Sequence, residues 1–481
     1  MPVDSTQEQP NVILVSMDSV RYDYYSKHTV GSPTGPDILD FDVTRFSSAY
    51  ANAPYTPASV PSFLTGELPL EDGHVMHRDS KTLPEYFNDG GYQTILGYNN
   101  VQISRFGVTD EFDIVVDHTQ PENSSGSAHS LSERIRSLIG DIIEITPNSE
   151  DIKKFGDYWL TDLERRFTSP PPSHAPDESV IDELLVRRDE IEEPFFLWIH
   201  MMDTHHPYVF DSEDWAVLTD EPLDRQHHRR LFEQAKLDIS VGDYRRPLDQ
   251  RQRNLMRHTY EASILRANRN VSRLLSEFAT PNSVCAITSD HGEELWERGF
   301  FGHAAAPSKP RRMTLTEEMI HVPLLLASPS AVAHEVSTPV SLVDLLPTLL
   351  DAAGIEVPSA LRGRSLLPVV EGGKLSSQPV FAHATSPGDP KTYYEHPDAR
   401  TLGAVLDGHV KYRWSDDGQE LLHDLEEDPS ESVDIAGAHG EKTNELANLL
   451  RDSLKPYKKS TTTDGIDEKI ENQLRDLGYL E

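Results

Sequence analysis

Three short apolar runs in this 481-residue chain each end in residues that can bind a metal ion or move a proton. The runs start at positions 11, 194 and 283 and read NVILVSMDS, PFFLWIHMMDTHHPY and SVCAITSDHGEE. None of them alternates apolar with polar residues, which is typical of central strands in a parallel sheet covered on both faces. Ligands of such sheets bind beyond the carboxyl ends of the strands. The pattern predicts an α/β fold with a mostly parallel sheet, and a site formed by Asp18, the His200 to His206 segment, Asp290 and His291.

Helices are expected between these strands, over residues 82–92, where Gly90 and Gly91 would stop the helix, and over residues 254–278. Polar stretches rich in Pro, Ser and Gly at 119–190 and 209–252 are expected to be insertions or lids. The predicted organisation is a catalytic α/β domain over 1–375, a smaller C-terminal α+β domain over 376–460 and a tail over 461–481.

The chain is strongly acidic, with 80 Asp and Glu against 44 Lys and Arg and a formal net charge of -36. Such a surface repels nucleic acid and anionic membranes, so neither is expected as a partner. An acidic, lysine-poor composition is similar to that of halophilic proteins. No apolar stretch is long enough to cross a bilayer, and the first residues, MPVDSTQEQP, lack the pattern of an export signal, so a cytoplasmic location is expected.

The expected strand ends carry donors for a hard metal ion. Asp18, Asp290 and His291 offer carboxylate oxygens and an imidazole, a set suited to Mg²⁺, Mn²⁺, Ca²⁺ or Zn²⁺. A nucleophile is supplied by the segment NAPYTPASVPSFLTG, in which Thr56 precedes Pro57 and leads toward a helix. A helix N-terminus favours bound anions. A threonine hydroxyl there, with its oxygen on a metal ion, would become a nucleophile of lowered pKa. Pro61 leaves open whether the helix begins at Thr56 or later.

Segments along most of the chain carry a family resemblance. They are NVILVSMDSVRYDYYS, TPASVPSFLTG, FFLWIHMMDTHHPY, ITSDHGEELWERGFFGH, EEMIHVPLLLASP, VSLVDLLPTLLDAAGI, PSALRGRSLLP, HDLEEDPSE and LRDLGYLE. In order and spacing the chain resembles the sulfatase family of the alkaline phosphatase superfamily. The resemblance leaves out the polar stretches at 119–190 and 209–252.

The resemblance implies that Asp18, Asp290 and His291 bind a divalent metal ion, with Thr56 as nucleophile and bridging ligand. His205, in the pattern from Asp203 to Tyr208, would bind the substrate anion or protonate the leaving group, and His303 would take the other role. Asp203 and His206 would either form a second metal site with His303, as in two-zinc phosphodiesterases of the superfamily, or shape the loop.

Two departures from the family pattern affect the expected chemistry. Members active on sulfate esters carry Cys or Ser, in a Cys-x-Pro-Ser-Arg stretch, which is oxidised to formylglycine. Here residues 56–60 read TPASV, and a threonine cannot give formylglycine because its oxidation yields a ketone. A threonine nucleophile is instead similar to that of phosphodiesterases and phosphoglycerol or phosphoethanolamine transferases of the superfamily. The second departure is Ser19, which stands where many sulfatases have another aspartate.

The expected function is metal-dependent hydrolysis or transfer of a phosphoric or sulfuric ester, with phosphodiesters or phosphonates favoured over sulfates. Alternatives are a degenerate member that binds a metal and an anionic glycan or head group, and, disfavoured by the C-terminal half, a mutase or isomerase. The expected substrate is a small anionic ester, such as a sulfated or phosphorylated sugar or lipid head group.

Five further positions have expected roles. His200 lies inside an apolar run and is expected to be a satisfied core histidine. Arg21 is expected to form a salt bridge or to support Asp18. The cluster of Lys309, Arg311 and Arg312 is the best local source of positive charge for an anionic substrate.

Overall fold

The structure is a computed structural model that describes residues 9–29, 31–32, 35, 41–71, 80–105, 107–119, 174–240, 248–303, 315–386 and 400–455. Contacts divide the chain into two units, residues 1–119 with 176–481 and residues 120–175. Every element below belongs to the first unit. The cluster of Lys309, Arg311 and Arg312, most of the expected insertion at 119–190 and the expected tail lie outside the described residues.

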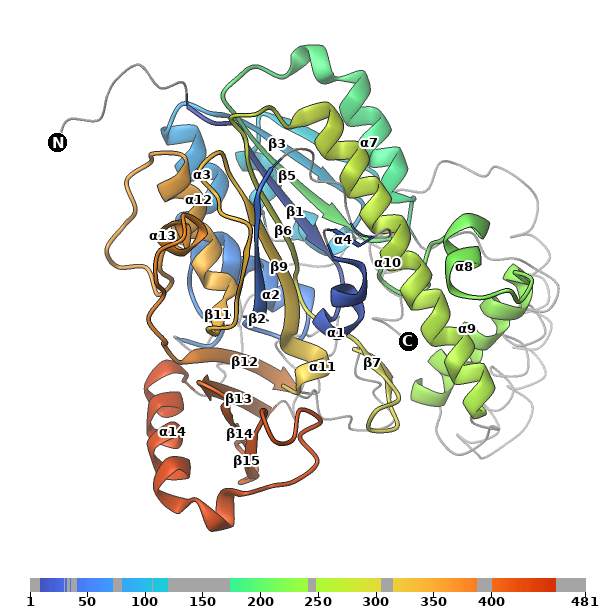
Figure 1. The fold of residues 1–481 in the computed structure, drawn as a ribbon, viewed down its shortest axis with the longest axis vertical. Coiled ribbons are helices and arrows are strands. Elements are labelled where there is room, and N and C mark those ends of the chain that lie inside the picture. Colours follow the sequence, from blue (N-terminus) through green and yellow to red (C-terminus); the bar gives the residue numbers. More distant parts are fainter. Residues whose placement is uncertain are drawn as a thin grey trace, which may run out of the picture. The chain divides into compact units, whose positions relative to one another are not determined.

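A nine-stranded sheet forms the centre of this unit, with the strand order β10-β2-β9-β6-β1-β5-β3-β4 and β11 paired with β2 (Figure 1). Its strands are β1 (Val12–Met17), β2 (Val43–Tyr50), β3 (Gln93–Tyr98), β4 (Ile114–Asp117), β5 (Phe195–Met201), β6 (Val284–Ser289), β9 (His321–Ala327), β10 (His334–Val336) and β11 (Val340–Ser341). All strand pairs are parallel except those that β9 makes with β2 and β6. The mostly parallel α/β sheet is therefore confirmed.

Helices cover both faces of the sheet, which explains why the central strands are apolar throughout. Alternate residues of β1 point to opposite faces, and Val12 and Leu14 belong to one core cluster while Ile13 and Val15 belong to the other. The first face is covered by α2 (Thr56–Thr65), α3 (Leu83–Asp89), α4 (Val101–Arg105), α12 (Leu345–Ala352) and α13 (Leu367–Val370). The second is covered by α1 (Tyr22–Tyr25), α7 (Asp177–Val186), α9 (Arg225–Ser240) and α10 (Gln250–Phe278).

Both helices expected from the sequence are present. Helix α3 ends at Asp89, and Gly91 next to it has a φ of 81°, a conformation that favours glycine. Helix α10 begins at Gln250, four residues earlier than expected, because Asp249 and Gln252 form a capping box. Short helices α8 (Ser212–Leu218) and α11 (Glu317–Ile320) and the small β7–β8 pair (Glu294–Leu295, Phe301–Gly302) complete this part.

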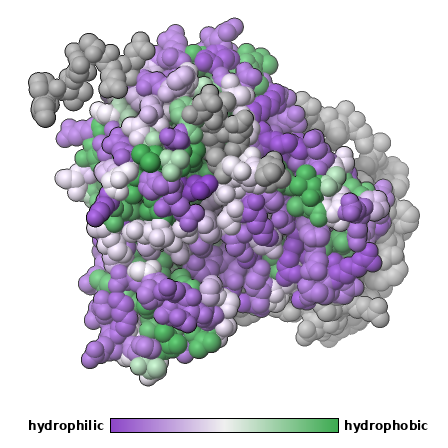
Figure 2. All heavy atoms as spheres, in the orientation of Figure 1, coloured by the Kyte–Doolittle hydropathy of each residue, from purple (hydrophilic) through white to green (hydrophobic). Residues whose placement is uncertain are grey.

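A second, antiparallel sheet follows toward the C-terminus, with α14 (Gly440–Ser453) against it. Its strands are β12 (Val380–Ser386), β13 (Arg400–Asp407), β14 (Val410–Ser415) and β15 (Glu420–Asp424). Leu446 and Leu450 of α14 pack on Val405 and Tyr412. Hydrophilic side chains cover much of the visible surface (Figure 2). None of the helices in the described ranges combines the length and apolar character needed to span a bilayer.

Buried ion pairs join this second sheet to the segment before β9. Lys411 on β14, 1% exposed in its side chain, lies 2.8 Å from Glu317 and 3.2 Å from Glu431. Arg298 binds Glu431 at 3.4 Å. Burial opposes the ionisation of Glu317, but Lys411 and His321 lower its pKa to about 2. Glu317 therefore stays charged because its cationic partners are in place.

We predict that Lys411→Met destabilises the fold by about 3 kcal/mol, because it removes the nearest cation from the half-buried Glu317 and from the buried Glu431. Lys442→Met is the matched control, since Lys442 pairs with Asp407 at 2.7 Å but is 30% exposed, and it should cost under about 1 kcal/mol. Urea unfolding at pH 7 measures both. Equal losses in the two variants would contradict the role given to the buried pair.

His383 on β12 is a second connection between the two sheets. It is buried, hydrogen-bonds the Pro69 carbonyl beyond α2, and lies 3.0 Å from Ser453 Oγ on α14. Burial lowers the pKa of His383 to about 4. The unfolded chain, with an ordinary histidine pKa of about 6.5, therefore binds more protons between these values than the folded chain does.

We predict that His383 makes the free energy of unfolding fall as the pH drops from about 6.5 to 4, by about 3 kcal/mol in full. His383→Gln keeps a hydrogen-bonding side chain but does not titrate, so its stability should fall less over this range. The exposed His409 gives the control His409→Gln, which should follow the wild type. A His383→Gln curve parallel to the wild type would show that the folded protein protonates His383 freely.

Candidate active site

The carboxyl ends of four neighbouring strands, β6, β1, β5 and β3, place the expected site residues together. In the register of the sheet, Met17 lies beside both Ser289 and Met201. The next residues after β1 and β6, Asp18 and Asp290, therefore leave the sheet side by side. Both are fully buried. The residues expected from the sequence therefore lie at the edge of the parallel sheet where ligands usually bind.

Thr56 is the first residue of α2, which settles where that helix begins. Pro57 occupies its first turn, where a missing N–H costs nothing, and Pro61 lies inside the helix without stopping it. The Thr56 hydroxyl donates to Asp18 Oδ2 at 3.2 Å and lies 3.3 Å from His291 Nε2. A buried hydroxyl at a helix N-terminus thus faces the two strand ends.

The two buried carboxylates differ in their proton affinity. Burial opposes ionisation of Asp18, but His205, His200 and His291 hold its pKa well below the usual range. Burial, together with the nearby charge of Asp18, raises the pKa of Asp290 to about 8. Without a cation between them, only one of the two groups is readily ionised at neutral pH.

The donor set fits a divalent cation. The Gly292 carbonyl lies 2.8 Å from His291 Nδ1, and since a carbonyl only accepts, Nδ1 carries the proton and Nε2 presents a lone pair. That lone pair faces Asp18 at 3.7 Å and Asp290 at 3.6 Å. No donor in the described residues forms a hydrogen bond with the buried Asp290 Oδ2. Oxygen and nitrogen lone pairs that converge in this way are stabilised by a positive ion. Asp18 lies within ligand spacing of His291 and His303 in one group and of His200 and Asp290 in another, with the donor atoms of each group within 4.8 Å of one another.

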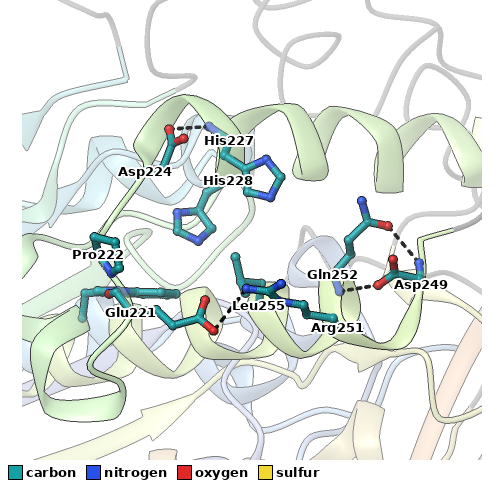
Figure 3. Close-up of a pocket in the computed structure, with 10 residues that line it drawn as sticks. Glu221, Pro222, Asp224, His227, His228, Asp249, Arg251, Gln252 and Leu255 are labelled. Atoms are coloured by element: carbon teal, nitrogen blue, oxygen red, sulfur yellow. Dashed lines mark hydrogen bonds and ion pairs between the residues drawn. The ribbon is translucent and has the colours of Figure 1, made fainter.

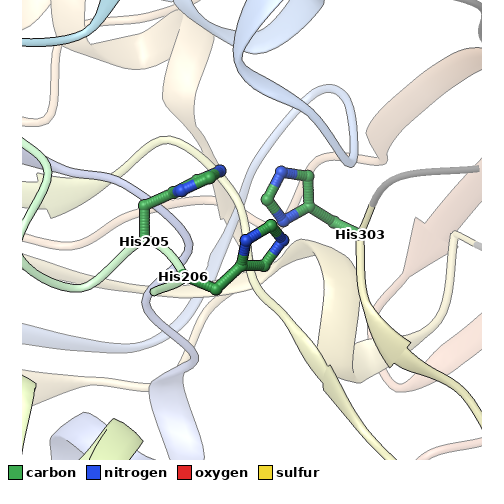
Figure 4. Close-up of side chains that lie close together, drawn as sticks. All are labelled: His205, His206 and His303. Atoms are coloured by element: carbon green, nitrogen blue, oxygen red, sulfur yellow. The ribbon is translucent and has the colours of Figure 1, made fainter. Parts of the chain in front are cut away.

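Three histidines from two loops form a second cluster beside this set. Ring nitrogens of His205, His206 and His303 lie within 4.8 Å of one another, and all three residues are buried (Figure 4). Burial and the neighbouring His291 lower the pKa of His303 well below its usual value. Its Nδ1 lies 3.1 Å from Glu293 Oε1. Such a cluster can hold a cation, or it can bind an anion and exchange protons with it.

Other expected residues have different partners. His200 hydrogen-bonds Ser16 Oγ at 2.9 Å, as a satisfied core histidine would, and also lies 3.5 Å from Asp18. Asp203 points away from the histidine cluster, because its carboxylate accepts from Arg266 at 2.9 Å and from the Asp177 N–H at 3.1 Å. The expected place of Asp203 in a second metal site does not fit these contacts.

Arg21 does not support Asp18. Its guanidinium pairs with Asp23 and Glu297, each at 2.7 Å. Of the two roles expected for Arg21, a salt bridge or support of Asp18, the salt bridge is therefore the one confirmed.

Two residues at the site were missed in the sequence. Asn100 donates to Asp18 Oδ2 at 2.9 Å; it follows the carboxyl end of β3, so the strand-end rule could have found it. Glu293 orients His303 and follows His291 by two residues in the DHGEE stretch. Its role is visible only in three dimensions, because His303 is ten residues further along the chain.

The comparisons with known proteins agree with this geometry. The sulfatase family matches residues 10–355. The chain belongs to the sulfatase family. A further family, described as N-sulphoglucosamine sulphohydrolase, C-terminal, matches residues 310–460. As a family member the chain is a hydrolase of ester bonds.

Individual relatives cover nearly the whole chain at low identity. The N-acetylglucosamine-6-O-sulfatase of Bacteroides thetaiotaomicron is 25% identical, over 95% of this chain and 88% of that protein. The phosphonate monoester hydrolase structure of Agrobacterium radiobacter has a TM-score of 0.63 at 20% identity, covering 92% of this chain and 94% of that one. A solved structure with its substrate D-glucosamine-2-N,6-O-disulfate has a TM-score of 0.64 at 18% identity, covering 95% and 100%. These structures share the fold of this chain.

Proposed function

We propose that this sulfatase-family hydrolase uses Thr56 as its nucleophile and acts on phosphodiester or phosphonate esters in preference to sulfate esters. The observation that carries the proposal is the position of the Thr56 hydroxyl, at the start of α2 and within 3.3 Å of both Asp18 and His291. Threonine cannot be converted to formylglycine, so its own hydroxyl oxygen is the group available for attack. The fold shared with a phosphonate monoester hydrolase is consistent with this substrate class.

In this mechanism Thr56 attacks the ester, and other residues of the chain hold the metal ion or transfer protons. A divalent ion held by Asp18, Asp290 and His291 would supply positive charge that lowers the pKa of the Thr56 hydroxyl and offsets charge on the ester oxygens. The Thr56 hydroxyl gives up its proton along its hydrogen bond to Asp18 Oδ2, and its oxygen forms a bond to phosphorus as the bond to the leaving oxygen breaks. Protonated His205 gives the leaving oxygen its proton and later takes one from the attacking water or alcohol. The bond from phosphorus to the Thr56 oxygen then breaks, and Asp18 returns the proton to Thr56.

His303 completes this assignment by holding a nonbridging oxygen of the ester. An anionic ester next to it favours the protonated imidazole, and Glu293 at 3.1 Å stabilises that form. Asn100, which donates to Asp18 Oδ2, keeps that carboxylate oriented toward Thr56. We propose a sulfated or phosphorylated sugar, or a lipid head group, as the small anionic substrate, and the relative named for N-acetylglucosamine favours the sugar.

The histidine cluster supports a second assignment, in which His205, His206 and His303 hold a second divalent ion. The observation that favours it is the convergence of three ring nitrogens within 4.8 Å, with Glu293 fixing the ring of His303 as carboxylates do for metal-bound histidines. Metal analysis separates the two assignments. Two ions per chain, with one lost in His206→Phe, would establish the second ion, and one ion per chain would leave the histidines to anion binding and proton transfer.

We predict that Thr56→Val lowers kcat on p-nitrophenyl phosphonate and diester substrates by at least about 10³-fold, because it keeps the side-chain shape but removes the nucleophile. Initial rates on matched sulfate, phosphate monoester, diester and phosphonate esters measure this, in high salt with Mn²⁺, Mg²⁺, Ca²⁺ or Zn²⁺. Thr56→Ser retains a hydroxyl and should retain most of the activity.

Each outcome of these assays bears on a different part of the proposal. Sulfate ester turnover that exceeds turnover of the phosphorus esters would contradict the threonine mechanism. Absence of turnover on all four esters would favour a degenerate protein that binds a metal and an anionic glycan or head group. Full activity of Thr56→Val would exclude Thr56 as the nucleophile.

We predict that Asp290→Asn stabilises the metal-free protein at pH 7, by about 2 kcal/mol, because it removes one of two facing buried carboxyl groups. The same change should abolish stabilisation by Mn²⁺, which in the wild type should reach about 2.7 kcal/mol at 100 times its Kd. Thermal unfolding with and without Mn²⁺ measures both effects.

The exposed Asp89 gives the matched control Asp89→Asn, which should alter neither quantity. If Asp290→Asn keeps the full Mn²⁺ effect, the ion is held elsewhere in the protein.

A further inference from the structure

A cavity of about 550 Å³ lies between the N-terminal ends of α9 and α10 and the loop after α8. Its lining includes Trp215, and Figure 3 labels Glu221, His228, Arg251 and Leu255 among the other lining residues. A volume in this range suits a small organic ligand. None of the residues assigned above to the ester chemistry lines it.

His228 points into this cavity and has an uncommon environment. It is 6% exposed, and neither of its ring nitrogens has a hydrogen-bond partner in the described part of the chain. Its ring contacts Trp215, with centroids 4.6 Å apart, and the Trp215 indole is held by a 2.6 Å bond from Nε1 to the Glu221 carbonyl. Leaving a buried polar group unsatisfied costs free energy. A ligand that bonds to the imidazole would recover that cost.

The charges around the cavity exclude an anionic ligand. Glu221, Asp224 and Asp249 line it, and among the described lining residues only Arg251 is a permanent cation. The acidic side chains already have partners, since Asp224 and Asp249 cap α9 and α10 through the His227 and Gln252 N–H groups. The capping carboxylates also offset the positive ends of the two helix dipoles. A sulfate or phosphate group would meet net negative charge here.

The polar and apolar groups of the cavity fit an uncharged ligand that is rich in hydroxyl groups. Burial and the nearby His227 lower the pKa of His228, which favours the neutral imidazole. A neutral imidazole has one hydrogen-bond donor and one acceptor, and a hydroxyl group can bind to either of them because it both donates and accepts. Carboxylate oxygens at the edge accept from further hydroxyls. Leu255, Pro222 and Trp215 provide apolar surface for C–H groups. From the cavity, the unpaired His228 and the charge of the lining, we propose that this is a binding site for an uncharged sugar unit.

Helix α9 connects this cavity to the candidate active site. Phe232 lies one helical turn after His228 on α9, and its ring contacts that of His206 with centroids 5.6 Å apart. If the ester hydrolysis proposed above holds, the substrate is an ester of an oligosaccharide, with an unesterified sugar unit in this cavity. Sugar binding itself does not depend on Thr56.

Calorimetric titration of the full-length protein with N-acetylglucosamine, cellobiose and N,N′-diacetylchitobiose tests the proposal, with 6-sulfated N-acetylglucosamine and choline as charged probes. At least one of the three uncharged sugars should bind with a Kd below about 1 mM. His228→Phe keeps a ring against Trp215 but removes both nitrogens, and it should weaken that binding at least tenfold. Thermal unfolding of the variant confirms that the fold is intact.

His258→Phe is the matched control, because His258 contacts Trp215, with centroids 6.1 Å apart, and does not line the cavity. It should leave sugar binding unchanged. Two measurements separate this inference from the proposed function. Hydrolysis of a p-nitrophenyl ester should be unaffected by His228→Phe. Sugar binding should persist in Thr56→Val. Binding of none of the uncharged sugars, preferential binding of choline or of the sulfated sugar, or full sugar binding by His228→Phe would overturn the proposal.

Discussion

The burial of two facing carboxyl groups, Asp18 and Asp290, is the constraint on which the candidate site depends. The parallel sheet brings them together because β1 and β6 are neighbours and end in register. Burying two such groups is unfavourable unless a cation or protons compensate for their charge. In the protein alone a proton on Asp290 does so, because burial and the charge of Asp18 raise the pKa of Asp290 to about 8. A divalent ion would replace that proton and bring positive charge to Thr56.

The same edge of the sheet would let an acidic protein attract the anionic ester proposed above as its substrate. The chain carries a formal charge of -36, so its overall field opposes such a substrate. Close to Thr56, however, imidazoles of His205, His206 and His303 gather within 4.8 Å. A metal ion on the neighbouring carboxylates would add positive charge there. In the proposed function the attraction of the substrate is therefore local and acts against the long-range field.

Much of the candidate site could be predicted from the sequence because its residues directly follow the ends of strands. Asp18 and Asp290 directly follow two predicted strands, and His291 follows Asp290. Parallel strands end at one edge of a sheet, so the proximity of these residues in space could be predicted from the local sequence. Thr56 could be placed at a helix start because of Pro57, although Pro61 obscured where the helix begins.

The other parts of the candidate site depend on the directions in which side chains point, and no local sequence pattern reveals these directions. Asp203 and His206 are close in the sequence, yet Arg266 on α10 draws the Asp203 carboxylate away while His206 joins the cluster. Arg21 is likewise drawn away from Asp18 by Asp23 and Glu297, the second of which is far away in the chain. Long-range partners of this kind decide which of several candidate residues reach the site.

The proposed mechanism requires that the Thr56 oxygen forms a covalent bond to phosphorus. Rapid quenching of the enzyme during turnover of an aryl phosphonate ester, followed by peptide mass spectrometry, tests for this bond. We predict a phosphonyl group on Thr56, in the peptide that contains residues 56–65, and no such group in Thr56→Val. A phosphonyl group on another residue, or single-turnover product that takes its oxygen from water with no protein adduct, would contradict it.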